Sequence, residues 1–239
     1  RGEEMEPSST SQAVDDTQGQ ALFRGTSLIP AVYHASCGGH TERNEDAWPG
    51  ATPHPSLRGQ EDIKHSKELA AQNGNEKYSM SDHDVARMLK EDNHAFCSVP
   101  KKGKPAFRWK RVFGKKHIRG LDPKKRLGEI LDIKVMARGV GGHATRVRII
   151  GTDGWHDIKP ELEIRRRLGA TVPLRSSLFV LSSKKNANNL LEELHVTGGG
   201  FGHGVGLCQN GAVGMAELGH DADQILQHYF DESEIVRIY

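Results

Sequence analysis

The segment from residue 198 to residue 212 places one histidine among regularly spaced glycines. It runs GGGFGHGVGLCQNGA, with glycine at every second position from Gly200 to Gly206. In an extended strand, alternate residues face opposite sides, so one face would be bare backbone and the other would present the imidazole of His203. Glycine weakens a strand, and four of them in alternation favour the close approach of another chain or of a flat ligand such as a sugar ring.

A nucleotide site and a packing role are the alternatives for this segment. The spacing fits neither the GxGxxG fingerprint nor the P-loop, which argues against those two kinds of nucleotide site. Tight packing against a neighbouring element would also explain the bare face, with His203 as a hydrogen-bonded core residue.

A second polar segment, YHASCGGHT at residues 33–41, combines two imidazoles with the hydroxyl groups of tyrosine, serine and threonine. Imidazole, hydroxyl and amide side chains donate and accept hydrogen bonds, as the hydroxyl groups of a sugar require. We expect His34 and His203 to bond to such hydroxyls, or to orient a carboxylate, and Tyr33 or Phe201 to stack on a sugar face.

The three cysteines, Cys37, Cys97 and Cys208, are an odd number without a CxxC pair. Three interpretations stay open: buried inert thiols, one disulfide with one free thiol, and a metal site of mixed cysteine and histidine ligands. The histidines near them are His34, His40, His94 and His203. Such spacings are common by chance, so we assign no metal ligand and no cofactor.

The elements that must position these segments are short. In the first half we predict a helix over residues 8–16, a hairpin of residues 21–23 and 28–35, a polar and flexible surface excursion over residues 44–81, and a helix over residues 81–90. In the second half we predict a hairpin of residues 130–137 and 145–150, a helix over 158–168, a strand over 177–181, a helix over 212–218, and a last helix capped by Asp221 and Gln224. Antiparallel hairpins with a few short helices, and no βαβ alternation, predict an α+β fold.

Composition limits the partners. The chain has 239 residues, 36% of them hydrophobic, and a formal net charge of +2, which is typical of a folded protein without a charged tail. Residues 101–116 are basic, but the alternation of Phe107, Trp109 and Phe113 favours a half-buried strand over a nucleic-acid surface. No apolar stretch is long enough to span a membrane. The start at Arg1 without an initiator methionine leads us to expect a piece of a longer protein.

Two motifs resemble the SpoIID/LytB family. They are YHASCGGHTE at residues 33–42 and GFGHGVGLCQNGA at residues 200–212, in the family's order and at its distance. Shorter similarities are AVDDTQGQ at 13–20, SSLF at 176–179 and QILQHYF at 224–230, so the resemblance spans nearly the whole chain.

The resemblance implies an extracytoplasmic role in bacterial cell-wall remodelling. SpoIID-like members are lytic transglycosylases that cleave peptidoglycan glycan strands lacking stem peptides, without hydrolysis and with one acid or base carboxylate. LytB-like members are amidase enhancers. The family's catalytic glutamate lies in a Ser/Ala-Glu-Met-Pro segment before the position of Ala13, and Glu4-Met5-Glu6-Pro7 is too close to Ala13 to be that segment.

We therefore interpret residues 1–239 as a SpoIID/LytB-type domain lacking its N-terminal catalytic segment, and assign no catalytic residue. The zinc ligands of some members belong to that segment too, so these cysteines do not inherit that role. Predicted glycan-binding residues are Tyr33, His34, Ser36, Gly38, Gly39, Thr41, Gly200, Phe201, Gly202, His203, Gly204 and Gln209. The expected partners are glycan strands and a cell-wall amidase, not nucleic acid. A noncatalytic, amidase-stimulating wall binder and a simple packing role for both motifs remain the alternatives.

Overall fold

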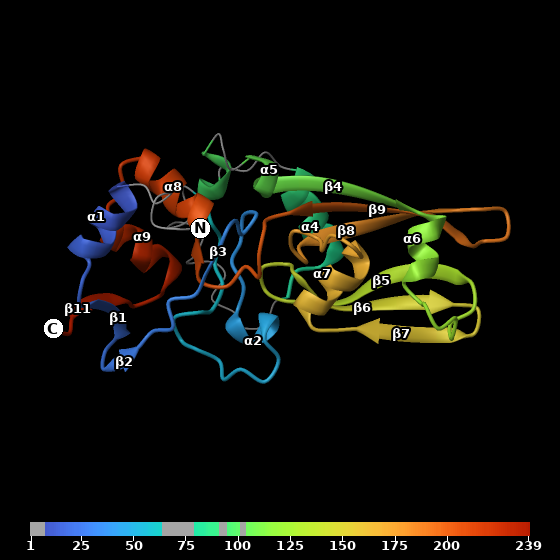
Figure 1. The fold of residues 1–239 in the computed structure, drawn as a ribbon, viewed down its shortest axis with the longest axis horizontal. Helices are drawn as coiled ribbons and strands as arrows, with labels where there is room; N and C mark the ends of the chain where they lie inside the picture. The colour runs from blue at the N-terminus through green and yellow to red at the C-terminus, as the bar shows by residue number, and fades with distance from the viewer. Residues whose placement is uncertain (1–7, 64–78, 91–94, 101–103) are drawn as a thin grey trace.

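The computed structural model describes residues 8–63, 79–90, 95–100 and 104–239. Two lobes lie at opposite ends of an elongated molecule, with loops and short elements between them (Figure 1). Helices and antiparallel sheets are both present, which confirms the predicted α+β class.

The first lobe contains both ends of the described chain and has a small antiparallel sheet in the order β11-β1-β2. Its elements are α1 (Ser8–Asp16), β1 (Gln20–Arg24), β2 (Ser27–Leu28), α8 (Gln209–Glu217), α9 (Ala222–Tyr229) and β11 (Glu234–Arg237). Asp221 and Gln224 form the predicted capping box at the start of α9, which buries Ile225 and Tyr229. These side chains share a core with Leu22.

The second lobe packs two three-stranded antiparallel sheets, β4-β9-β8 and β5-β6-β7, around one core. Its elements are α4 (Asp82–Lys90), β4 (Arg108–Gly114), α6 (Lys115–Gly120), β5 (Ile130–Arg138), β6 (Ala144–Gly151), β7 (Gly154–Ile158), α7 (Glu161–Gly169), β8 (Phe179–Lys185) and β9 (Leu191–Gly199). The side chains of Ile133 and Val147 from one sheet meet those of Phe179 and Leu194 from the other. This lobe is a β-sandwich covered by short helices.

Short elements join the lobes. They are β3 (Tyr33–His34), α2 (Asn44–Ala47), the 3-10 helix η3 (Phe96–Ser98), α5 (Lys104–Phe107) and β10 (Leu207–Cys208). β3 and β10 pair in parallel, Tyr33 with Leu207 and His34 with Cys208. This pairing brings the two sequence motifs together.

Four predicted elements were wrong in extent. The strand expected over residues 177–181 is β8, which ends at Lys185, and the helix expected over 212–218 is α8, which begins at Gln209. The second hairpin strand was expected over residues 28–35, but β2 ends at Leu28 and residues 33–34 pair in a different sheet. Pro30 lies between them, and proline cannot donate a ladder hydrogen bond. The helix expected from Ile158 begins at Glu161, after Pro160, because Ile158 closes β7. The strands β7 and β9 were not predicted.

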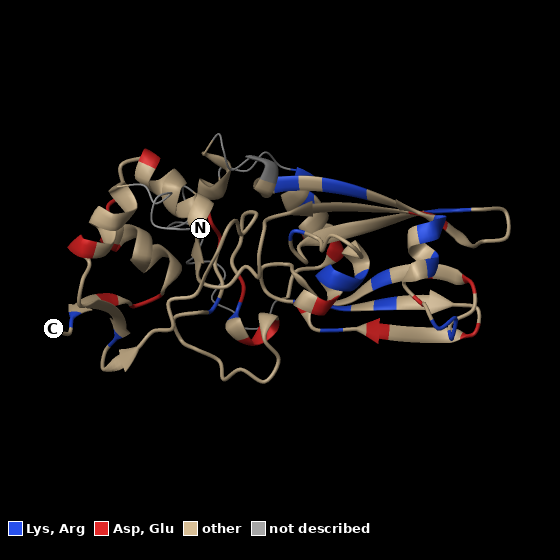
Figure 2. Ribbon diagram, in the orientation of Figure 1, with Lys and Arg blue, Asp and Glu red and all other residues tan. Residues whose placement is uncertain are grey.

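Within the basic stretch, β4 is a half-buried strand, as expected, although Phe107 belongs to α5 and not to the strand. Trp109 and Phe113 are buried in the second-lobe core, while Lys110 is exposed. Lys and Arg residues are also spread over α6, α7 and β6 (Figure 2). The aromatic rings of this stretch thus face the core and are not available for stacking on bases.

The predicted excursion over residues 44–81 is described in part. Residues 44–63 pack against the rest of the protein. Arg58 pairs with Arg43 and Glu61 with His40 in isolated bridges, and Asp62 is fully buried. Residues 64–78 lie outside the described part of the chain. Among the described residues, no helix has the length and apolar composition needed to cross a membrane.

Candidate functional site

Two loops lie side by side between the lobes, and we call them together the two-loop site: residues 33–43 and residues 200–208. Ser36 and Phe201 exchange both backbone hydrogen bonds, with N···O distances of 3.1 and 2.7 Å. The Glu42 N–H donates to the Gly204 carbonyl at 2.8 Å. Together with the β3–β10 pairing, these bonds hold the two motifs in one unit.

The glycine segment is not the extended strand that its alternation predicted. Gly200, Gly202, Gly204 and Gly206 all have positive φ, at 77°, 119°, 81° and 70°. This region of backbone space disfavours side chains with a Cβ. A Cβ on Gly202 would also lie 2.7 Å from the Cβ of His34, and one on Gly204 would lie 2.7 Å from the His143 ring. The glycines are therefore required by backbone twist and by close packing of the two loops.

Two imidazoles meet at this junction. The His34 side chain is buried and its Nδ1 lies 3.1 Å from the Val205 carbonyl oxygen. The half-buried His203 accepts the Val205 N–H on Nδ1 at 3.0 Å. The two rings are 5.5 Å apart, and the Trp48 ring lies 4.9 Å from that of His203 on its other side. Burial, with the nearby imidazoles of His34 and His143, lowers the pKa of His203 to about 4.

The predicted binding residues divide by exposure. Tyr33 and Phe201 are 63% and 45% exposed, Gln209 is exposed, and Gly202 and His203 are half-buried. The others are buried in the junction: His34, Ser36, Gly38, Gly39, Thr41, Gly200 and Gly204. Of the buried hydroxyls, that of Thr41 accepts the Gln60 N–H at 2.9 Å. The most exposed predicted binding residues are thus two aromatic side chains and one amide, on the two chain segments that also carry His203.

Sequence reasoning missed a buried carboxylate at the same junction. Glu42 is 1% exposed, and its Oε1 accepts the His143 N–H at 2.8 Å and lies 3.2 Å from His143 Nδ1. His143 follows the glycine-rich turn after β5, and a Cβ on Gly139 or Gly141 of that turn would overlap Glu42 or the loop beside it. The turn therefore joins the second lobe to the site.

Two other residues next to the site had no role in the sequence-based prediction. Trp48 contacts His203, as described above, and is 38% exposed. Burial and the neighbouring Glu42 carboxylate raise the pKa of Asp46, although its hydrogen bond from Val140 N opposes this shift. Both follow the first motif within a few positions, so a longer motif window would have included them.

Comparison with known proteins places this chain in a family. A family model described as a domain of unknown function, DUF8618, matches residues 42–206. The chain belongs to the DUF8618 family. The match starts at Glu42 and ends at Gly206, so it includes His143 and most of the glycine segment.

Three relatives of this DUF8618 protein align with most of its length. An uncharacterized protein of Brachyspira hyodysenteriae is 28% identical over 237 residues, covering 98% of this chain and 50% of the relative. The amidase enhancer of Bacillus subtilis is 24% identical, covering 93% and 32%. The stage II sporulation protein D of Bacillus amyloliquefaciens is 29% identical, covering 93% and 49%. The DUF8618 chain thus spans half or less of the length of the curated relatives it matches, and two of their names agree with the resemblance noted from the motifs.

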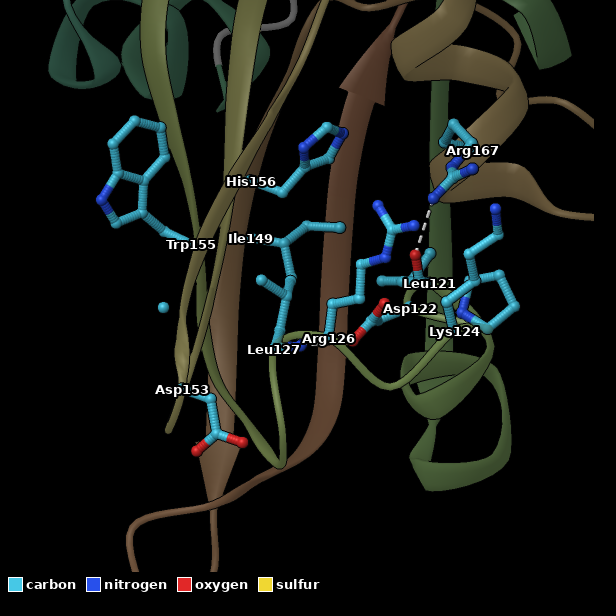
Figure 3. A pocket seen from close by; sticks show the side chains of 12 residues that line it. Leu121, Asp122, Lys124, Arg126, Leu127, Ile149, Asp153, Trp155, His156 and Arg167 are labelled. Atoms are coloured by element: carbon cyan, nitrogen blue, oxygen red, sulfur yellow. Dashed lines mark hydrogen bonds between the residues drawn. The ribbon is translucent and has the colours of Figure 1, made fainter.

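A separate cavity of about 390 Å³ lies in the second lobe of the DUF8618 chain (Figure 3). Trp155 and His156 line one side, and Arg126 and Arg167 line the other, where Arg167 donates to the Leu121 carbonyl at 2.8 Å. None of the predicted binding residues lines this cavity.

The lowered pKa of His203 predicts that acid destabilises the DUF8618 chain. The unfolded state takes up a proton near the ordinary histidine pKa of about 6.5, but the folded state does so only near 4. Stability is therefore complete above pH 6.5 and is lost as the pH falls toward 4. We expect the titration of His203 alone to lower the free energy of unfolding by about 2 kcal/mol between pH 7 and pH 5.

The measurement is urea unfolding at pH 7 and pH 5, for the wild type and for His203→Asn, whose amide oxygen replaces the Nδ1 acceptor. The variant should lose less stability than the wild type over this interval. An equal loss in both proteins would show that His203 does not carry the effect.

Proposed function

We propose that this chain is a glycan-binding module of an extracytoplasmic bacterial protein that remodels peptidoglycan. The supporting observation is that Tyr33 and Phe201 are exposed on adjacent loops, one of which also carries the half-buried His203. The names of two relatives, an amidase enhancer and a stage II sporulation protein D, point to the same process.

The site chemistry suits a carbohydrate. Aromatic rings offer a flat apolar surface, with a polar group on tyrosine, for the face of a sugar. With a pKa of about 4, His203 is neutral near pH 7. Its Nδ1 already accepts the Val205 N–H, so the other nitrogen of the neutral ring is the donor, which can bond to the oxygen of a hydroxyl group. Gln209 adds an amide that can also donate and accept.

In the intact protein, we propose that the module holds a glycan strand lacking stem peptides for non-hydrolytic lytic transglycosylase cleavage. We assign the catalytic acid to a segment outside this chain. The Glu42 carboxylate is buried and engaged with His143, so it is poorly placed to reach a glycosidic oxygen.

A noncatalytic role is the second candidate, because the B. subtilis relative is named amidase enhancer. In this case the same site binds glycan and presents it to a cell-wall amidase. The two candidates differ in turnover: only the first forms anhydro-muramyl ends.

Removal of an exposed aromatic ring should weaken glycan binding. We expect Phe201→Ala and Tyr33→Ala each to weaken binding to peptidoglycan without stem peptides by about tenfold, the equivalent of about 1.4 kcal/mol. The measurement is a sedimentation binding assay with purified glycan. Trp155→Ala is the matched control, because Trp155 is 58% exposed but lies in the second lobe.

Mass spectrometry of the same mixtures, and of mixtures with the full-length gene product, tests turnover. Anhydro-muramyl ends from the long protein alone would support the enzyme, and binding without such ends would support the amidase-stimulating role. Equal binding by all three variants would remove the two-loop site from the proposal.

A further inference from the structure

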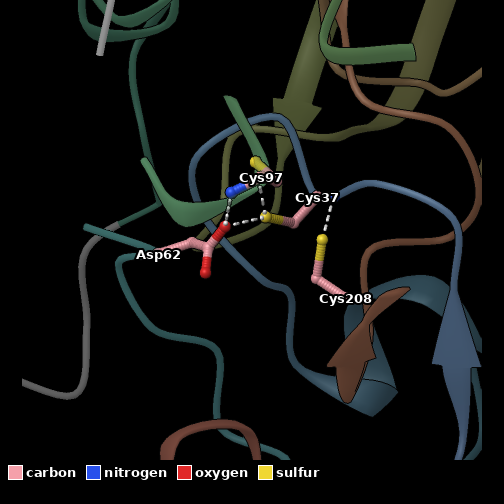
Figure 4. Close-up of side chains that lie close together, drawn as sticks. All are labelled: Cys37, Asp62, Cys97 and Cys208. Carbon is pink, nitrogen blue, oxygen red and sulfur yellow. Dashed lines mark hydrogen bonds between the residues drawn. The ribbon is translucent and has the colours of Figure 1, made fainter. Parts of the chain in front are cut away.

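Four side chains converge in the interior of the protein, two from the two-loop site and two from neighbouring segments (Figure 4). Cys37, Asp62, Cys97 and Cys208 are all fully buried. Their three sulfur atoms and one carboxylate oxygen lie within 4.8 Å of one another. We propose that these four residues bind one zinc ion as a structural site, independently of any glycan-binding role of the surface above them.

The distances suit a shared ion better than a disulfide. The Sγ atoms of Cys37 and Cys97 are 3.6 Å apart, whereas a disulfide bond is about 2.05 Å long. Two thiolates bound to one tetrahedral zinc at about 2.3 Å lie about 3.8 Å apart. The Asp62 Oδ2 atom lies 3.1 Å from Cys37 Sγ, so it needs little movement to become the fourth ligand. All three cysteines are free thiols, which leaves their sulfur atoms available.

Backbone N–H groups donate hydrogen bonds to the sulfur atoms and so favour a negative charge on them. Cys208 Sγ accepts the N–H groups of Cys37 and Gly211, each at 3.2 Å. Cys37 Sγ accepts the Gly39 N–H at 3.4 Å. Hydrogen bonds to the charged form stabilise a thiolate, which is the state that binds a metal. Cys208 also caps the N-terminus of α8, where the helix dipole favours an anion.

The carboxylate is held by its own partners. Tyr229 Oη donates to Asp62 Oδ1 at 2.6 Å, and the Cys97 N–H donates to Oδ2 at 3.1 Å. His228 Nε2 lies 3.4 Å from Oδ1. Such outer partners orient the ligands of protein metal sites. A fully buried carboxylate among three thiols is otherwise a costly group, and a divalent cation would compensate its charge.

Zinc is the cation that fits these ligands. Thiolates select soft or borderline metals, and four protein ligands without an open position are typical of structural zinc. Calcium and magnesium prefer sites made of oxygen atoms alone. The bound ion would cross-link four segments of the chain: the first loop, residue 62, η3 and the start of α8.

The experiment measures the metal content of the intact chain, purified with a reductant and without a chelator. We expect about one zinc per chain by mass spectrometry of the metal. Replacement by cobalt should give the intense sulfur-to-cobalt absorption of thiolate ligation. A mercurial thiol reagent should release the zinc from the wild type, which tests the site even if a cysteine variant does not fold.

The variants Cys208→Ser and Asp62→Asn should each lose most of the zinc. Asp62→Asn keeps the shape of the side chain, so we expect it to disturb folding less than Cys208→Ser does. His156→Ala, an exposed histidine of the second-lobe cavity, should keep the metal. Three outcomes would overturn the proposal: three titratable thiols in a chain that takes up neither zinc nor cobalt, one titratable thiol after denaturation without reductant, or unchanged zinc in both site variants.

Discussion

Substitution of Glu42 by alanine is expected to destabilise the protein by about 4 kcal/mol. The Glu42 carboxylate is 1% exposed and lies against both the backbone N–H and the imidazole of His143. Alanine leaves these buried groups without their acceptor, and it opens a cavity between the loop and the turn at residues 139–143. Both effects act in the same direction. Urea unfolding at pH 7 measures the change.

Glu45 provides the matched control for Glu42. It has the same side chain on the same segment, but it is partly exposed and pairs with Arg58 at 2.8 Å. Exposed ion pairs contribute at most about 1 kcal/mol, so Glu45→Ala should cost no more than that. Equal losses in the two variants would contradict the role given to the Glu42–His143 pair.

Substitution of Gly206 by alanine is expected to cost about 3 kcal/mol. Its φ of +70° is unfavourable for alanine by about 1 kcal/mol. The new Cβ would lie 2.3 Å from the Val32 carbonyl oxygen, which accepts the N–H of Leu207 in the β3–β10 pairing. A backbone atom cannot move away as a side chain can, so the overlap adds about 2 kcal/mol.

Gly50→Ala separates the two contributions. Gly50 has a φ of +90°, but a Cβ there meets no atom within 4 Å. It should therefore cost about 1 kcal/mol, from backbone strain alone. If both variants lose the same stability in urea unfolding, the close contact with the Val32 carbonyl is not what requires glycine at position 206.

The elements predicted well from sequence are those fixed by local chemistry. The helix predicted from residue 81 starts with hydrogen bonds between Ser81 and Asp84, and the predicted cap of the last helix joins Asp221 and Gln224. In both caps the partners are three residues apart. The hairpin of β5 and β6 follows from alternation of apolar residues on either side of a glycine-rich turn. Neither feature needs a distant part of the chain to be known.

The glycine segment shows where local chemistry misleads. Glycine at every second position is compatible with an extended strand and also with a backbone that turns to positive φ at each glycine. The structure has the second arrangement, because His34 and His143 pack where side chains would otherwise be. Only the position of these partners, far away in sequence, distinguishes the two.

The candidate site was predicted in part for the same reason. The resemblance to known motifs indicated that residues 33–42 and 200–212 belong together, and they are adjacent in the structure. The partners of Glu42 and of the cysteines are single residues, His143 and Asp62. A single histidine or aspartate has no pattern in the sequence that would indicate such a contact.

The pairing of β3 with β10 also constrains how the protein folds. The whole second lobe lies between these two strands in sequence, but its β-strands start and end at one place, where Arg108 of β4 pairs with Gly199 of β9. Closing a long flexible loop costs entropy, and a folded lobe with adjacent ends shortens the loop that remains to be closed. We therefore expect the second lobe to fold first and the two loops to meet late, in a slow refolding step of a chain rich in non-local contacts.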